Sequence, residues 1–234
     1  LAFKQANIEI HQIISKNKKS GELLAKKTNA SFTNDINQLS IIDLIIICVN
    51  DDNILSVINH LPDVPMLHTS GFTDLKVFNK KTNFGVLYPI QSLSKEVSID
   101  FKKIPICIEA NSKQFELKIY KLSNLITKQV LYLNSAQRKH IHLAAVIASN
   151  FSNFCYLIAK KHLDSENLNF SLLKPLIIET ANKIANGDPL LNQTGPAKRG
   201  DEKIIKEHLK LLKDENHKKI YKLLSNNILI EYGK

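Results

Sequence analysis

Short apolar runs alternate with polar, helix-compatible segments through the first half of the chain. Runs rich in β-branched and aliphatic residues predict strands over residues 8–14, 39–49, 64–69, 85–89, 104–110 and 129–133. The segments between them predict helices over residues 21–28, 54–60, 74–79 and 113–126. The run IIDLIIICV is apolar on both faces, which is typical of a central parallel strand covered by helices. The alternation predicts an α/β fold with a doubly wound parallel sheet.

The second half of the chain follows a helical pattern to its end. Asn134 and Gln137 have capping-box spacing at the start of a helix predicted to reach about Leu163. Further helices are predicted over residues 171–187, 201–212 and 217–230. We therefore expect an α/β domain over residues 1–90, a continuation of the sheet with a linker over 91–134, and a mostly α-helical domain over 135–234.

The long helix that follows Asn134 is apolar nearly all round, which predicts burial in a core or in a subunit interface. Its polar residues fall at helical spacings and form one stripe: Arg138, His142, Ser149, Asn150 and Asn153. Because buried polar groups need partners, the stripe either faces a ligand cleft or forms an internal hydrogen-bond network. These polar residues also interrupt the most apolar stretch, so we expect no membrane-spanning segment.

Composition narrows the class of protein. The 234 residues carry a net charge of +10, yet the lysines are scattered, aromatic residues make up only 7%, and Trp is absent. A nucleic-acid surface would more often show a basic stripe with stacking aromatics, so no nucleic-acid partner is expected.

The three cysteines, Cys48, Cys107 and Cys155, lie in apolar runs without a CxxC pair. They predict buried thiols in a reducing, cytoplasmic compartment and no metal site.

Two strand ends carry candidate cofactor contacts. Ser15 and Lys16 open the turn SKNKK after the first predicted strand. In a dinucleotide-binding sheet, an acid there binds the 2′-hydroxyl of NAD, whereas basic and hydroxyl residues suit the 2′-phosphate of NADP. The turn has no acid, so NADP is favoured over NAD; a solvated lysine turn is the alternative. Val49, Asn50 and Asp51 follow the long apolar strand, where ligands bind in such sheets, and capping of the next helix is their alternative role.

Candidate catalytic residues are His68, Ser70 and His142. His68 and Ser70 lie in the turn HTSG at a strand end, where an imidazole and hydroxyls could position a carbonyl or transfer a proton. Gly71 in the same turn would let the backbone approach a ligand closely. A hydrogen-bonded turn without catalytic function is the alternative.

Candidate substrate contacts are more dispersed. Tyr88 and Gln91 follow the strand over 85–89, where a passage between domains is expected, and Asn150 belongs to the polar stripe. Thr194 and Arg199 lie in the loop QTGPAKRGD, whose hydroxyl and cations could hold an anionic group. A simple helix–helix linker is the alternative for this loop.

Several segments together resemble one family. They are VNDDNI, LHTSG, YPIQSLSKE, IPICIEAN, NSAQRKHIHLAAVIASNFSNFCYLIA and QTGPAKRGDEKIIKEHL. They resemble the Rossmann-like proteins that carry domain of unknown function 2520, over nearly the whole chain. That family is similar to pyrroline-5-carboxylate reductase and to the 6-phosphogluconate and β-hydroxyacid dehydrogenases.

The resemblance implies an NADP-dependent oxidoreductase that transfers a hydride to or from a small substrate in an interdomain cleft. It also implies a homodimer built through the helical domain, and a first strand with a glycine-rich phosphate loop that would precede Leu1. One departure matters: β-hydroxyacid dehydrogenases place a catalytic Lys one helical turn before an Asn, and here Val146 and Ile147 occupy that spacing before Asn150. Their proton-transfer mechanism is therefore not carried over. A non-catalytic nucleotide- or metabolite-binding regulatory protein of the same fold is the alternative.

Overall fold

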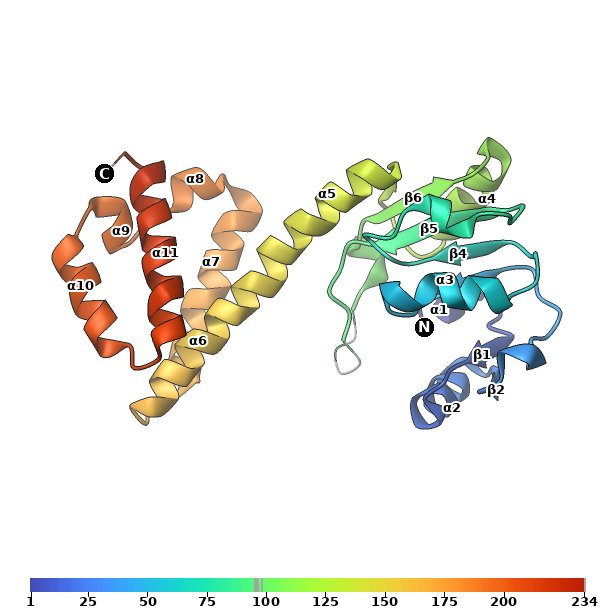
Figure 1. Cartoon of the computed structure of the whole chain (residues 1–234), viewed down its shortest axis with the longest axis horizontal. Coiled ribbons are helices and arrows are strands. Elements are labelled where there is room, and N and C mark those ends of the chain that lie inside the picture. Colours follow the sequence, from blue (N-terminus) through green and yellow to red (C-terminus); the bar gives the residue numbers. More distant parts are fainter. Residues whose placement is uncertain (95–96, 98, 234) are drawn as a thin grey trace. The chain divides into compact units, whose positions relative to one another are not determined.

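The structure of the chain is a computed structural model that describes residues 1–94, 97 and 99–233. It divides into two compact units, Leu1–Asn150 and Phe151–Lys234 (Figure 1). The first is mixed α/β and the second is helical, which confirms the predicted fold class. Lys95 and Glu96, at the end of the segment YPIQSLSKE, lie outside the described residues.

The first unit is built on a five-stranded sheet of order β3-β4-β5-β6-β7. Its strands are β3 (Ile45–Ile47), β4 (Met66–His68), β5 (Phe84–Pro89), β6 (Ile106–Ala110) and β7 (Val130–Tyr132). The β3–β4, β4–β5 and β6–β7 pairs are parallel, whereas β5 and β6 pair antiparallel. The sheet is therefore mixed rather than wholly parallel, although its first three strands keep the predicted parallel order.

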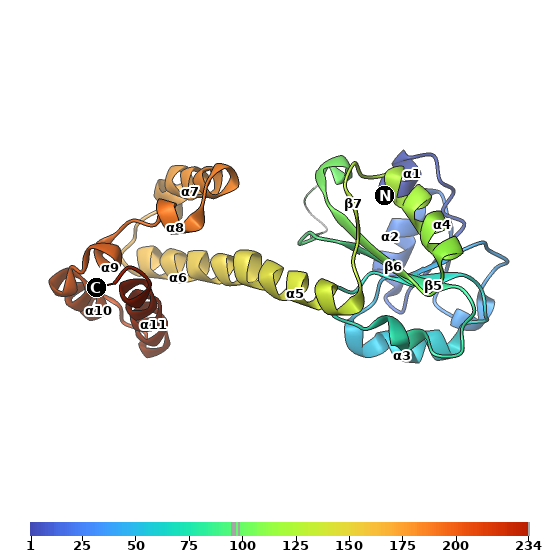
Figure 2. The same ribbon diagram turned by 90° about the horizontal axis from the view of Figure 1, so that it is seen from above.

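Helices cover both faces of this sheet (Figure 2). Successive side chains of a strand point to opposite faces, so Met66 packs with α3 (Asp51–His60) while Leu67 packs with α4 (Lys113–Asn124). The short helix α1 (Ala2–Gln5) packs against the same cluster as α4. Both clusters contain side chains with no exposed surface, such as Met66, Leu67 and Ile54.

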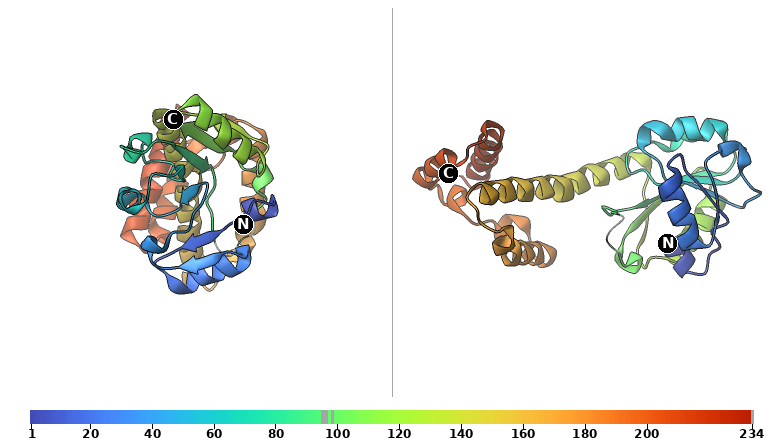
Figure 3. Two further views of the ribbon diagram at one scale, coloured as in Figure 1. Left: turned by 90° about the vertical axis from the view of Figure 1, so that its right-hand side faces the viewer. Right: turned by 90° about the horizontal axis from the view of Figure 1, so that it is seen from below.

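A second, two-stranded sheet pairs β1 (Gln12–Ile14) in parallel with β2 (Ser31–Thr33), with α2 (Lys18–Thr28) between them in the chain (Figure 3). The turn that begins α2 follows directly from the end of β1, as the sequence predicts. The strand β2 was not predicted, because three residues are too few to produce an alternating pattern. Gly21 is required where α2 meets β2, since a Cβ there would lie 2.3 Å from the Phe32 ring.

Several predicted elements differ in extent from the observed ones. The predicted strand over residues 39–49 pairs only over Ile45–Ile47, and the predicted helix over 74–79 is the 3-10 turn η2 (Leu75–Phe78). The remaining 3-10 turns of the first unit are η1 (Ile36–Gln38) and η3 (Phe101–Lys103). Apolar runs mark which segments are buried, but only backbone pairing decides where a strand ends.

The long helix is continuous from Ser135 to Ser165 and consists of α5 (Ser135–Ala145), a π-helical segment η4 (Val146–Phe151) and α6 (Ser152–Ser165). Its predicted capping box is present, because the Asn134 side chain accepts from Gln137 N–H and the Gln137 side chain accepts from Asn134 N–H. The two compact units divide within η4, at Asn150. Length and apolar composition alone would allow this helix to cross a membrane, properties that helices in cores and interfaces share.

The second unit continues with η5 (Phe170–Leu173), α7 (Lys174–Asn186), α8 (Pro189–Asn192), α9 (Pro196–Arg199), α10 (Glu202–Leu211) and α11 (Glu215–Glu231). Of its described residues, only Ala197 and Ile205 are buried apolar ones. No residue of α6 or α7 is buried. Within the single chain, the apolar side chains of α6 and α7 are therefore not enclosed in a core.

The three cysteines do not share one environment. Cys107 in β6 is buried as predicted, whereas Cys48 and Cys155 are exposed, which contradicts the prediction of three buried thiols. Cys48 follows β3 at the sheet edge, and Cys155 lies on α6.

Candidate functional site

The turn after β4 is held by its own polar side chains. His68 has no exposed surface, its Nδ1 accepts from Ser70 N–H at 3.1 Å, and its ring stacks on Phe78 with centroids 5.4 Å apart. Burial, with a smaller contribution from the Arg138 guanidinium, lowers the pKa of His68 to about 3. His68 is therefore neutral and enclosed, a geometry that favours a turn-holding role over proton transfer.

Ser70 also shapes this turn. Its hydroxyl oxygen accepts from Phe72 N–H at 3.0 Å and from Thr73 N–H at 2.8 Å. These bonds occupy the lone pairs but leave the hydroxyl proton free to donate. The hydrogen-bonded turn that the sequence left open is thus present, and it brings Ser70 and Gly71 to the start of α5.

Arg138 connects the turn to the long helix. Its guanidinium is fully buried, and its Nη1 donates to the carbonyl oxygens of Ser70 at 3.3 Å, Gly71 at 3.2 Å and Thr73 at 2.8 Å. A planar guanidinium presents several donors in a fixed fork, so one side chain can hold three carbonyls of a single turn. The first part of the polar stripe is therefore an internal network.

Glu109 of β6 supplies the opposite charge. Its carboxylate accepts from Arg138 Nη2 at 3.1 Å, from Ser135 Oγ at 2.7 Å and from Ser135 N–H at 2.9 Å. Ser135 Oγ in turn accepts from Leu75 N–H at 3.0 Å. The network ties β6, η2 and the first turn of α5 together, and it fixes where the next turn of α5 lies.

His142, one helical turn after Arg138, meets Tyr88 at the end of β5. Tyr88 Oη lies 3.2 Å from His142 Nδ1, and the two rings meet edge to face with their centroids 6.0 Å apart. Gly71 lies against the pair. A Cβ at that position would be 2.5 Å from Nδ1 of His142 and 2.7 Å from Cζ of Tyr88. The Phe72 ring flanks the His142 imidazole, with the two ring centroids 6.3 Å apart. Burial raises the pKa of Tyr88, so its phenol stays protonated at neutral pH.

A separate polar turn lies at the end of β1. Asn17 caps α2 by accepting from Ser20 N–H at 3.0 Å, and Ser15 Oγ donates to the Asn17 carbonyl at 3.2 Å. Lys16 and Lys19 are exposed and form no ion pair with any residue that the structure describes. The turn therefore offers free positive charge at a helix N-terminus, an arrangement that suits a phosphate.

The other predicted cofactor contacts follow β3. Asn50 occupies the N-cap position of α3 without a side-chain capping bond, and Asp51 begins the helix, so both face solvent next to exposed Val49. Asp51 and the following acid suit the helix dipole but would repel a phosphate. Over the described ranges 1–94, 97 and 99–233, no three His, Cys, Asp or Glu side chains gather as a metal site requires.

The predicted substrate contacts are not all brought together. Tyr88 joins His142, whereas the Gln91 side chain accepts from the adjacent Ser92 N–H at 2.9 Å in an exposed bend. Asn150 is exposed in η4. Thr194 and Arg199 belong to the second unit.

In the second unit, Arg199 pairs with Asp201, with Nε and Nη2 at 2.9 and 2.8 Å from its carboxylate. Asp201, at the predicted cap position of α10, makes no side-chain capping bond. Lys198 donates to the Gln193 carbonyl at 2.8 Å and lies over the Tyr232 ring, while Thr194 is exposed. The predicted linker with two cations is thus largely engaged within its own unit.

Two residues of the network, Arg138 and Glu109, were not among the predicted site residues. Arg138 was visible as a charge on an apolar helix, and Glu109 as the only acid in the strand segment IPICIEA. Charged residues are rarely buried unless paired, so each signalled a partner. The sequence did not show that they pair with each other, because 29 positions separate them.

Comparison with known proteins places the chain in a family. The model of the domain of unknown function DUF2520 matches residues 104–228. A structure from Bacteroides fragilis described as a "putative NADP oxidoreductase" is 34% identical, covers 97% of this chain and 91% of that one, and superimposes with a TM-score of 0.92. The chain therefore belongs to the DUF2520 family, as the sequence segments predicted. None of the curated proteins matches the chain.

More distant structures share the fold. A protein from Thermotoga maritima is 23% identical, with a TM-score of 0.74 over 99% of this chain and 94% of that one. A reductive aminase from Aspergillus terreus in complex with NADPH and ethyl levulinate is 12% identical. The match covers 98% of this chain and 88% of that one, with a TM-score of 0.66. These likenesses confirm the Rossmann-like fold of the first unit.

Proposed function

We propose that this protein is an NADP-dependent oxidoreductase that transfers a hydride to or from a small carbonyl, imine or hydroxy substrate. The observation that carries the proposal is the Tyr88–His142 pair at the end of β5, held next to the turn that follows β4. Ligands of parallel α/β sheets bind at the carboxyl ends of the strands. The description of the Bacteroides fragilis relative and the NADPH bound to the reductive aminase support the same class.

The residues present fit NADP better than NAD. Ser15, Lys16 and Lys19 surround the N-terminus of α2, and no acid lies in the turn to bind a ribose 2′-hydroxyl. Uncompensated lysines and a helix N-terminus both favour a 2′-phosphate. When bound, reduced nicotinamide would supply the hydride.

The chain's own residues would position the substrate and move its proton. His142 is the candidate proton carrier, and the free hydroxyl proton of Ser70 is a candidate hydrogen bond to the reacting oxygen or nitrogen. Val49, Asn50 and Asp51 remain proposed cofactor contacts. Gln91, Asn150, Thr194 and Arg199 remain proposed substrate contacts.

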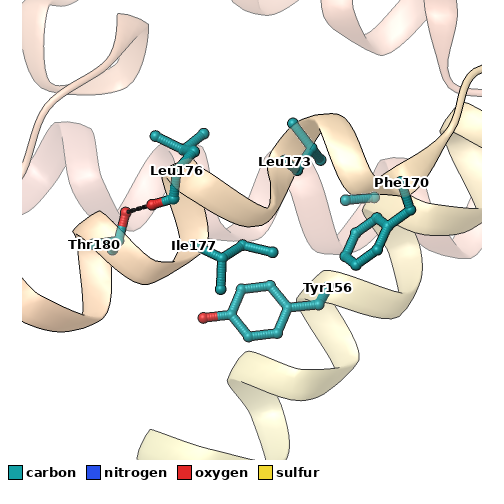
Figure 4. A pocket seen from close by; sticks show the side chains of 7 residues that line it. Tyr156, Phe170, Leu173, Leu176, Ile177 and Thr180 are labelled. Atoms are coloured by element: carbon teal, nitrogen blue, oxygen red, sulfur yellow. Dashed lines mark hydrogen bonds between the residues drawn. The ribbon is translucent and has the colours of Figure 1, made fainter.

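We also infer that the protein functions as a homodimer through its helical unit. Large apolar side chains of this unit are exposed in the single chain, among them Leu176 at 62%, Leu191 at 77% and Ile230 at 76%. Between α6, η5 and α7 lies an apolar hollow of about 210 Å³, onto which Tyr156, Phe170 and Ile177 face (Figure 4). Apolar surface of this extent marks an interface, and a second copy offers the matching helices.

Calorimetric titration of the full-length protein with NADPH and NADH tests the cofactor proposal. Removal of a charged contact to a phosphate costs on the order of tenfold in affinity. Lys16→Glu should therefore weaken NADPH binding by at least about tenfold and leave NADH binding nearly unchanged. Lys26→Glu makes the same charge change at the other end of α2, and it should alter neither the NADPH affinity nor the NADH affinity. No heat of binding with either nucleotide would reject the proposal, while binding without turnover of any substrate would favour the regulatory alternative.

A further inference from the structure

Tyr88 and His142 form a pair whose geometry is set by three surrounding elements. The pair joins β5 to α5 through the 3.2 Å contact between Oη and Nδ1. Gly71 closes one side, because the space that its Cβ would need is filled by the His142 ring and by Tyr88. Arg138 fixes Gly71 in turn by donating to its carbonyl at 3.2 Å. No other residue that the structure describes hydrogen-bonds the His142 ring.

We propose, as a step that rests on the oxidoreductase function, that Tyr88 is a positioning residue that holds Nδ1 of His142 and leaves Nε2 as the nitrogen that gives the proton to the substrate. A phenol both donates and accepts. In the proposed cycle its oxygen accepts from Nδ1–H both in the imidazolium and in the neutral ring that is left after Nε2 has given its proton, so the contact persists in both states. A ring held through one nitrogen has its other nitrogen fixed in direction.

In the reductive direction, a bound reduced nicotinamide would supply a hydride to the carbon of a C=O or C=N bond, and the π electron pair would move to the oxygen or nitrogen. That atom takes the proton from Nε2 of the His142 imidazolium, which becomes neutral. A proton from solvent then restores the imidazolium. Tyr88 keeps its own proton throughout.

The surroundings of the pair support His142, rather than Tyr88, as the group that exchanges the proton. Tyr88 is only 8% exposed, and burial holds its pKa above the usual value, so its phenol does not ionise at neutral pH. The charges near the pair are compensated, since Arg138 is paired with Glu109 and Lys139 with Asp74. The phenol of Tyr88 is thus not the group of the pair that exchanges a proton at neutral pH.

Nitrogen-15 NMR of protein labelled at histidine tests this assignment without cofactor or substrate. In the wild type, the His142 Nδ1 resonance should carry the shift of a hydrogen-bonded nitrogen, and Tyr88→Phe should move it. Tyr120→Phe removes a hydroxyl from the same unit at a tyrosine that stacks on Tyr132, and it should leave the resonance in place. An Nδ1 resonance that is identical in the wild type and in Tyr88→Phe would overturn the proposal.

Substitution of Gly71 and steady-state kinetics of Tyr88→Phe probe the same pair independently. Gly71→Ala inserts a methyl group against Nδ1 and should shift the same resonance, and its failure to do so would count against the assigned geometry. With a substrate that turns over, Tyr88→Phe should lower kcat by roughly a hundredfold, because proton transfer loses its alignment. The dissociation constant for NADPH and the KM should stay within about twofold. A change in KM alone would instead make Tyr88 a substrate contact, and failure of NADPH to bind would reject the oxidoreductase function while leaving the NMR result intact.

Discussion

Replacement of Arg138 by Met gives the clearest test of the network that builds the site. Met has a similar length and no charge, so it removes the cation that pairs with Glu109, whose carboxylate keeps only its two bonds from Ser135, and it leaves three turn carbonyls without the Arg138 donor. The Arg138 side chain has no exposed surface and that of Glu109 is 15% exposed, so water cannot readily replace the lost bonds.

The expected loss of stability follows from this burial. Removal of one partner of a buried, hydrogen-bonded ion pair costs about 3–5 kcal/mol, because the other charge stays buried without compensation. The neighbouring Lys139 provides a matched control, since it pairs with Asp74 at 3.0 Å but the two side chains are 37% and 41% exposed. Lys139→Met should cost less than about 1 kcal/mol, as exposed ion pairs do.

Urea unfolding measures the free energy of unfolding of both variants. The protein concentration is kept fixed, because the apparent stability of a homodimer depends on it. Addition of Glu109→Gln to Arg138→Met should recover part of the loss, about 1–2 kcal/mol, since it removes the unpaired charge. If Arg138→Met costs no more than Lys139→Met, the network does not hold the turn and the reasoning fails.

Two further predictions concern stability and assembly. The pKa of His68 is about 3 in the folded protein, below its ordinary value of 6.5, so the unfolded chain binds a proton that the folded chain does not. Stability should fall by about 1.4 kcal/mol per pH unit as pH drops from about 6.5 toward 3. His68→Asn, whose amide oxygen can accept the Ser70 N–H, should flatten this dependence in urea unfolding between pH 4 and 7, and an equally steep slope in the variant would contradict the assignment. Leu176→Asp, at the apolar hollow of the helical unit, should convert a dimer to monomer in sedimentation equilibrium, and a wild-type protein that is monomeric at all concentrations would refute the proposed interface.

The sequence predicted the fold because burial leaves a periodic signal. The apolar run around β3 and the capping box at Asn134 and Gln137 are local patterns, and both identify their elements correctly. The short strand β2 and the 3-10 form of η2 left no such signal, since both depend on pairing and packing with distant residues. The antiparallel pairing of β5 with β6 was missed for the same reason.

The site was predicted only in part. His142 and Tyr88 were each chosen separately, and their contact across 54 positions could not be read from spacing. His68 was chosen because a histidine followed by hydroxyls is typical of a catalytic turn, yet the same residue types satisfy one another within that turn. Arg199 was chosen as an anion clamp, but the sequence did not show that Asp201, two residues on, occupies its guanidinium.

Transfer of deuterium from NADPH labelled at the nicotinamide C4 position distinguishes hydride transfer from nucleotide binding alone. The full-length protein would be incubated with a panel of small ketones, keto acids and cyclic imines, and the products analysed by mass spectrometry. The account predicts a product that carries one deuterium at the former carbonyl or imine carbon, formed faster with NADPH than with NADH. No deuterated product across the panel, despite bound NADPH, would contradict hydride transfer as the function of this protein.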